Sequence, residues 1–194
     1  YDKHNLILKN IIRENSELSN LIYSSQNNNK KTFCTEYSIT YKEDCLGDRT
    51  YVNNYINFLI EKNLDIPSDD FLDGYADGKI LNDIGKYFYE KTEYEEAKKY
   101  LLKAYDTLTG DDKLIVAYNL GILFNNSSIY GRQKVKDAIT YFKESEFEEA
   151  YFNIFLNYYM GRGIKENDKK AMKYLNLASE MGVKRATYNL DTIN

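Results

Sequence analysis

The chain has 194 residues, of which 43% are hydrophobic and 29% charged, and its formal net charge is −4. This composition is typical of a globular protein with a sizeable core, so we expect one domain, or one domain with an extension, rather than general disorder. Basic residues form no stripe that would bind nucleic-acid phosphates, and no apolar run approaches the roughly 18 residues of a membrane-spanning helix. The single proline favours long, uninterrupted helices.

The first 75 residues are predicted to form a helical cap that contains a cysteine-bearing loop. Apolar residues recur at helical spacing over 3–24 and 49–63, and 64–75 is expected to be a connector. Between the two helices, Cys34 and Cys45 are candidates for a disulfide, which would stabilise by roughly 2–3 kcal/mol; two unrelated thiols are the alternative. Because the disulfide suits an oxidising compartment, we favour a periplasmic or secreted location over a cytoplasmic one. The chain begins with Tyr1, so we expect that a leader was removed or that the chain was trimmed.

From about residue 76 onward, the sequence repeats itself. Four similar segments, 80–85, 116–121, 150–155 and 186–191, end 36, 34 and 36 residues apart and predict the first helix of each unit. A second helix follows the first three, with two small residues seven positions apart and a tyrosine between them: Ala97, Tyr100 and Ala104; Ala138, Tyr141 and Ser145; Ala171, Tyr174 and Ala178. The small residues let neighbouring helices approach closely, and the aromatic ring fills the gap. The pattern predicts units at about 76–110, 111–145 and 146–182, and a terminal helix at 183–194.

Local signals predict where several of these helices begin and end. Thr92 with Glu95, and Ser145 with Glu148, match the capping box of a helix N-terminus. Asn167 is positioned to cap the helix that follows it. Gly182 stands where a helix ends in a left-handed residue.

The third unit carries a family resemblance. Its matching residues are Asn153-Ile154, Tyr158, Gly161-Arg-Gly163-Ile164, Lys170-Ala171, Tyr174, Ala178-Ser179, Gly182 and Ala186. On these residues the chain resembles the Sel-one-like repeat family, a close relative of tetratricopeptide repeats; the family's glycine is replaced by Phe155. The second unit matches in part, and the first has tetratricopeptide spacing. The resemblance implies an all-α fold, a right-handed superhelix in which stacked helix pairs share one core.

The resemblance also implies that the first helices line a concave binding face. Its residues would be Asn82, Lys86, Tyr89, Tyr118, Ile122, Asn125, Phe152, Leu156, Tyr159 and Tyr188. One interpretation is an aromatic-lined groove for a protein or peptide partner. The alternative is that Ile122, Phe152 and Leu156 pack within the molecule. The repeat-register polar residues Asp83, Asn119, Asn153 and Asn189 are expected to form structural hydrogen bonds between helices or to a neighbouring turn.

No group of side chains predicts a reaction, a metal site or a cofactor. His4 is the only histidine and has no serine or cysteine motif to serve, and no second cysteine pair completes a metal site. We therefore expect a non-enzymatic bacterial adaptor or scaffold that binds another protein. One alternative is an immunity protein or inhibitor that blocks a single toxin or enzyme. The other is a hydrolase related to cysteine-rich penicillin-binding relatives, but those carry a cysteine pair in each repeat.

Overall fold

The computed structural model describes residues 76–126, 130–131 and 134–193, together with 53, 56, 57, 59–61, 63, 65, 66, 69 and 72. Throughout this described part, regular secondary structure is helical and no strand occurs, which confirms the all-α class. The described positions from 53 to 61 are helical, as expected for the 49–63 segment. His4, Cys34, Cys45 and the helix predicted at 3–24 lie outside the described residues.

The chain divides into two compact units, Tyr1–Ile80 and Leu81–Asn194. The boundary falls in the first turn of helix α7 (Gly78–Glu90), slightly after the predicted boundary at residue 75. In the first unit, Ile56, Leu59 and Leu72 are fully buried. Asp77 accepts hydrogen bonds from the Asn53 amide and from the backbone N–H of Ile80, both at 3.0 Å. Asp77 therefore caps the start of α7.

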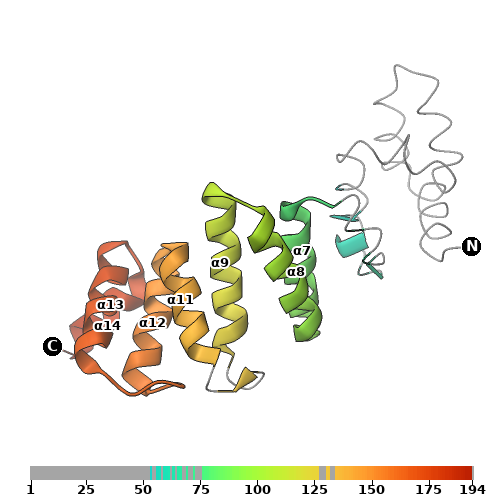
Figure 1. Ribbon diagram of the computed structural model, residues 1–194. Helices are drawn as coiled ribbons and strands as arrows, with labels where there is room; N and C mark the ends of the chain where they lie inside the picture. The colour runs from blue at the N-terminus through green and yellow to red at the C-terminus, as the bar shows by residue number, and fades with distance from the viewer. Residues whose placement is uncertain are drawn as a thin grey trace, which may run out of the picture. The chain divides into compact units, whose positions relative to one another are not determined.

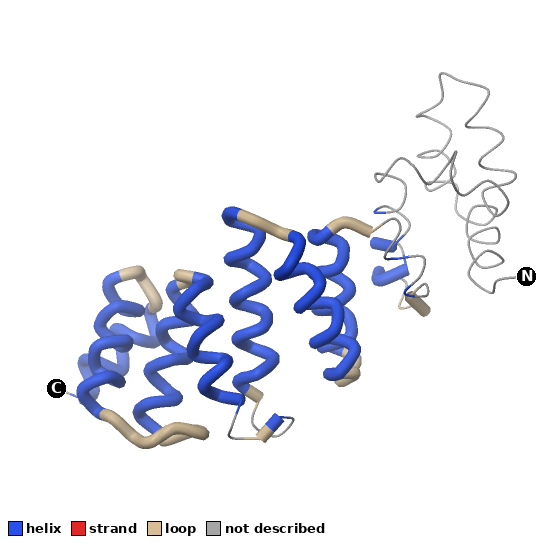
Figure 2. The backbone as a smooth tube through the Cα atoms, in the orientation of Figure 1, coloured by secondary structure: helices blue, strands red, loops and turns tan. Residues whose placement is uncertain are grey.

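The second unit is a series of helices in which each packs against the next. After α7 come α8 (Tyr94–Thr107), α9 (Gly110–Asn125), α11 (Val135–Ser145), α12 (Glu148–Met160), α13 (Asp168–Glu180) and α14 (Lys184–Ile193). From α8 to α14, each consecutive pair is in contact. Figures 1 and 2 show these helices side by side, with the connecting turns alternating between the two ends of the row.

The small residues and tyrosines of the predicted second helices make the expected packing. The six small residues are all fully buried: Ala97, Ala104, Ala138, Ser145, Ala171 and Ala178. Each tyrosine stacks on an aromatic ring of the preceding first helix: Tyr100 on Phe88 at 5.5 Å, Tyr141 on Phe124 at 5.8 Å and Tyr174 on Tyr158 at 6.0 Å between centroids. The same aromatic contact thus joins the two helices of each predicted unit.

Two glycines set how closely the paired helices approach. A Cβ atom on Gly85 would lie 2.6 Å from the Leu101 side chain, and one on Gly121 would lie 2.4 Å from the Phe142 ring. Both distances are far shorter than van der Waals contact, so only glycine fits at these positions in the observed packing.

Two of the predicted helix-end signals are confirmed. The Asn167 side chain accepts a hydrogen bond from the N–H of Lys170 at 2.8 Å, which caps α13. Gly182 has a φ of +96°, and the N–H of Val183 donates to the carbonyl of Ala178 at 3.0 Å. This is the Schellman arrangement, and Val183 and Ala178 share one buried cluster.

Both predicted capping boxes are wrong, because these residues end the preceding helix instead. Thr92 is left-handed, with a φ of +64°, and the following N–H, from Glu93, donates to Phe88 in α7. Helix α8 therefore begins later than predicted, and no side chain caps it. Ser145 is the last residue of α11; its hydroxyl donates to the carbonyl of Phe142 at 2.8 Å and does not cap α12.

Candidate protein-interaction face

Asparagine pairs connect the first helices of neighbouring units. The Asn119 amide of α9 donates to the Asn82 side-chain oxygen of α7 at 2.8 Å. The Asn157 amide of α12 donates to the Asn125 side-chain oxygen of α9 at 2.7 Å. The structural role predicted for Asn119 is confirmed, whereas Asn189 donates to the carbonyl of Arg185 within its own helix. These bonds fix the register between neighbouring first helices.

A third connection joins α12 to α14. The Arg185 guanidinium pairs with the Glu149 carboxylate and lies over the Phe152 ring, 4.3 Å from its centroid. Both charged side chains are half-exposed. An ion pair this exposed contributes little stability by itself. Its main effect is to hold Arg185 flat against the aromatic ring.

Tyr118 lies on α9 beside this cluster. Its ring meets the edge of Phe147 at 5.5 Å and is tilted against Phe142 at 6.0 Å. Burial, followed by the nearby Glu149 carboxylate, raises the pKa of the Tyr118 hydroxyl. The hydroxyl therefore stays protonated at neutral pH and is able to donate a hydrogen bond.

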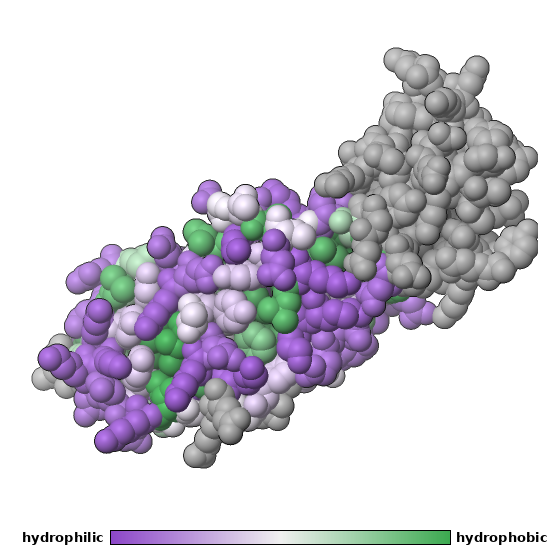
Figure 3. All heavy atoms as spheres, in the orientation of Figure 1, coloured by the Kyte–Doolittle hydropathy of each residue, from purple (hydrophilic) through white to green (hydrophobic). Residues whose placement is uncertain are grey.

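Several apolar side chains on these first helices remain exposed. Tyr188 of α14 is 71% exposed and Ile115 of α9 is 42% exposed. Ile115 precedes Tyr118 by three residues and so shares its side of the helix. We call the following set the first-helix face: Ile115, Tyr118, Glu149, Phe152, Leu156, Arg185 and Tyr188. On the side of the molecule in Figure 3, hydrophobic patches of limited size are separated by hydrophilic residues.

The predicted binding residues differ in how far the structure leaves them accessible. Tyr188 and Tyr159 are exposed, whereas Asn82 and Phe152 are buried. Phe152 belongs to the core cluster around Phe155, against which Leu156 also packs. The side-chain oxygens of Asn82 and Asn125 accept hydrogen bonds from Asn119 and Asn157. Of the predicted aromatic and aliphatic residues, Tyr159 and Tyr188 are therefore the most accessible, followed by the half-buried Tyr118 and Ile122.

The remaining predicted residues lie toward the other ends of the same helices. Lys86 is exposed and pairs with Asp83 at 3.4 Å. Tyr89 meets the edge of the Tyr94 ring at 5.6 Å, and Ile122 is half-buried. The predictions missed Ile115 and Arg185. Ile115 was detectable from its i, i+3 spacing to Tyr118, whereas the position of Arg185 over Phe152 depends on how α14 packs.

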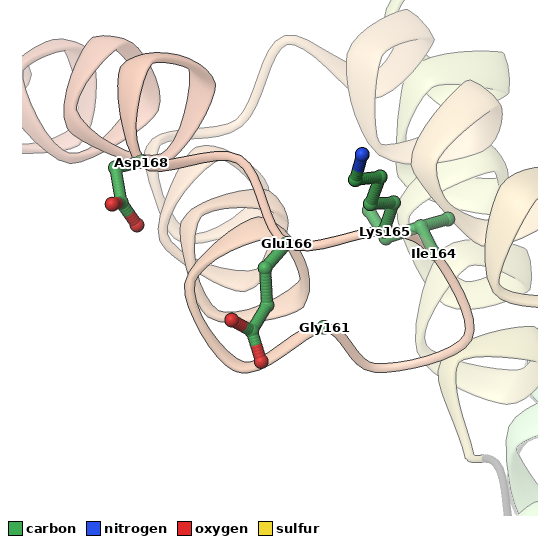
Figure 4. Close-up of a pocket in the computed structure, with 5 residues that line it drawn as sticks. All are labelled: Gly161, Ile164, Lys165, Glu166 and Asp168. Atoms are coloured by element: carbon green, nitrogen blue, oxygen red, sulfur yellow. The ribbon is translucent and has the colours of Figure 1, made fainter.

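Among the described residues, hollows lie at the start of α14 and in the turn between α12 and α13. The hollow at α14, of about 540 Å³, is lined by Glu148, Glu149, Met181, Gly182, Val183, Lys184 and Arg185. The hollow between α12 and α13 has a volume of about 470 Å³. Figure 4 shows that the Glu166 side chain reaches toward Gly161 there, while Lys165 and Asp168 extend away from it. The charged groups of this turn do not converge on one point.

No protein-family model, curated protein sequence or solved structure matches the chain. Of the helices that the structure describes, none combines the length and the apolar character that crossing a membrane requires. In the same part of the chain, no group of three or more histidine, cysteine or acidic residues could hold a metal ion.

Proposed function

We propose that this chain is a protein-binding adaptor or scaffold of the Sel-one-like type, with stacked helix pairs forming a superhelix. The aromatic contact repeated at Tyr100, Tyr141 and Tyr174 supports the repeat assignment. So do the close glycine contacts of Gly85 and Gly121 with the following helix. Each helix pair is too small to bury its apolar side alone, so stacking of neighbours is what stabilises such an array.

The observation that carries the binding role is the exposed apolar surface on a fixed framework. Ile115 of α9 and Tyr188 of α14 expose large side chains, and Tyr118, which follows Ile115 by three residues on α9, is half-buried. Asparagine pairs and the contact of Arg185 with Glu149 hold the underlying helices in register. Exposed aromatic and aliphatic side chains on a rigid surface are typical anchors for a partner. We propose that a partner segment binds across the first-helix face.

A pair of variants tests this role by affinity capture from a lysate of the native organism, followed by mass spectrometry. The face variant Ile115→Ser with Tyr188→Ser removes exposed apolar surface without opening the core. The control variant Lys136→Ala with Thr140→Ala changes exposed residues of α11. Phe152 is left intact because its substitution would also disturb the core. Circular dichroism must show that both variants fold.

We expect a protein captured by wild type and by the control variant to be lost, by about tenfold or more, from the face variant. Loss from both variants would show that the effect is not specific to this face. Undiminished capture by the folded face variant, or no captured protein at all, would contradict the proposed binding role.

A further inference from the structure

Carboxylates gather where second helices end and first helices begin. The turns between α8 and α9 and between α11 and α12 lie at the same end of the row of helices (Figure 2). A hydrogen bond from the Tyr105 hydroxyl to the Glu144 carboxylate joins the ends of α8 and α11. We call the following set the acidic edge: Asp106, Asp111, Asp112, Glu144, Glu146 and Glu148.

Few cations at this end oppose the acidic edge. The adjoining helix ends carry Lys103, Lys113 and Lys143, and Lys184 at the start of α14 lines the same hollow as Glu148. These four lysines compare with the six carboxylates of the acidic edge. The Lys113 ammonium lies 4.1 Å from the centroid of the Tyr105 ring, and that of Lys143 lies 5.8 Å from the centroid of the Tyr174 ring. Arg185, on α14, is paired with Glu149, which lies outside the set. The acidic edge therefore retains an excess of negative charge.

Stabilisation of the helix ends explains only some of the carboxylates in the acidic edge. Asp111, Asp112 and Glu148 lie in the first turns of α9 and α12, where negative charge is favourable. Asp106 and Glu144 lie in the last turns of α8 and α11, where a carboxylate opposes the helix dipole. Burial, and after it Glu144, raises the pKa of Tyr105. Burial, and after it Asp137, raises the pKa of Tyr141, with smaller contributions from Glu144 and Asp106. Both tyrosines thus experience the negative field of the edge.

The acidic edge borders the apolar part of the first-helix face. Ile115 follows Asp111 and Asp112 by about one helical turn and is 42% exposed. The Tyr118 ring contacts Phe147, which lies in the turn between α11 and α12, directly before Glu148. Apolar surface and unbalanced negative charge are therefore neighbours on α9 and at the start of α12.

We infer that the partner segment is basic and amphipathic, with lysine or arginine side chains on the acidic edge and apolar side chains against Ile115 and Tyr118. This inference rests on the proposed binding function and adds the chemical class of the partner. Complementary charge attracts the segment from solution and sets its position, while apolar contact keeps it bound. An acidic segment would be repelled by the acidic edge.

The probe is a library of random linear peptides displayed on phage and selected against the immobilised full chain at low ionic strength. Three variants are selected in parallel: Asp111→Lys with Glu148→Lys, Ile115→Ser with Tyr188→Ser, and the control Lys136→Ala with Thr140→Ala. Asp111, Glu148 and both control positions are exposed, so these substitutions leave the core intact. If the charge-reversed variant does not fold, Asp111→Asn with Glu148→Gln replaces it. Enriched peptides are then measured by fluorescence anisotropy at low and high salt.

We expect enriched peptides to be richer in lysine and arginine than the starting library. Their affinity should fall about tenfold or more with charge reversal, and also at high salt. Neutral or acidic peptides that tolerate charge reversal but are lost from Ile115→Ser with Tyr188→Ser would overturn the inference while leaving the binding function in place. Peptides that bind every variant equally, or no enrichment at all, would count against both.

Discussion

At the scale of single residues, the left-handed positions that end helices decide where the next helix begins. Gly161 and Gly182 adopt positive φ angles after α12 and α13, where glycine has no steric penalty. Thr92 and Glu146 adopt the same conformation after α7 and α11, although they carry side chains. For a β-branched residue such as threonine this conformation is strained, by roughly 1–2 kcal/mol.

Replacing Thr92 with glycine should therefore stabilise the protein. The released strain exceeds the extra conformational entropy that glycine gives the unfolded chain, and we expect a net gain of about 0.5–1 kcal/mol in the free energy of unfolding. Urea denaturation followed by circular dichroism measures this change. The control Thr140→Gly lies inside α11 and should lower stability, because glycine is the weaker helix former. A lower unfolding free energy for Thr92→Gly would contradict the strain argument.

At the scale of helices, the paired elements solve one packing problem in two ways. Gly85 and Gly121 leave room for Leu101 and Phe142 on the following helix. In the third unit Phe155 takes the glycine position, and it shares a buried cluster with Leu175. The first two helix pairs therefore depend on the absence of a side chain at a point where the third depends on a large one.

The substitution Gly121→Ala should destabilise the protein by about 1–3 kcal/mol, because its new Cβ overlaps the Phe142 ring. Phe142→Leu should cost stability by itself, since that side chain is fully buried. In the double variant, however, the smaller leucine side chain relieves the overlap. We therefore expect this variant to lose less unfolding free energy than the sum of the two single losses. A double-mutant cycle measured by chemical denaturation tests this coupling. Strictly additive losses would show that the ring does not limit the approach of α9 and α11.

At the scale of the whole molecule, tyrosines on several helices of the second unit share one electrostatic property. Burial is the leading cause that raises the pKa of Tyr105, Tyr118, Tyr130, Tyr141 and Tyr151. For Tyr130 it rises to about 12, with Glu95 as the next cause. The Tyr130 hydroxyl also donates a hydrogen bond to the carbonyl of Tyr94 at 2.8 Å, which ionisation would remove.

These shifts predict loss of stability in alkali. A tyrosine with a higher pKa in the folded state favours folding fully below about pH 10, and this contribution falls as pH rises through the folded pKa. Urea denaturation at several pH values, with tyrosinate absorbance as a second readout, should show unfolding free energy declining between about pH 10 and pH 12. The decline should be shallower for Tyr130→Phe. An unchanged slope in that variant would argue against the raised pKa of Tyr130.

Much of the fold was predictable because its signals are local or periodic. Small residues such as Ala97 and Ala178 recur in register, and all six of them are buried as predicted. The Asn167 cap depends only on residues within one helical turn. The Thr92 prediction was wrong because the same residues could start α8 or end α7. The hydrogen bond from Glu93 to α7 shows which alternative the folded chain adopts.

For the second unit, the sequence by itself thus determined the helices, their order and the small and aromatic residues that join them, because spacing along one chain sets which residues share a helix side. Only the tertiary structure decided how accessible the first-helix residues are. Packing buried Phe152 and engaged Asn82 with Asn119, yet left Tyr188 exposed. Their predicted positions in the repeat were equivalent. Their exposure differs because burial depends on which neighbouring helix covers each position.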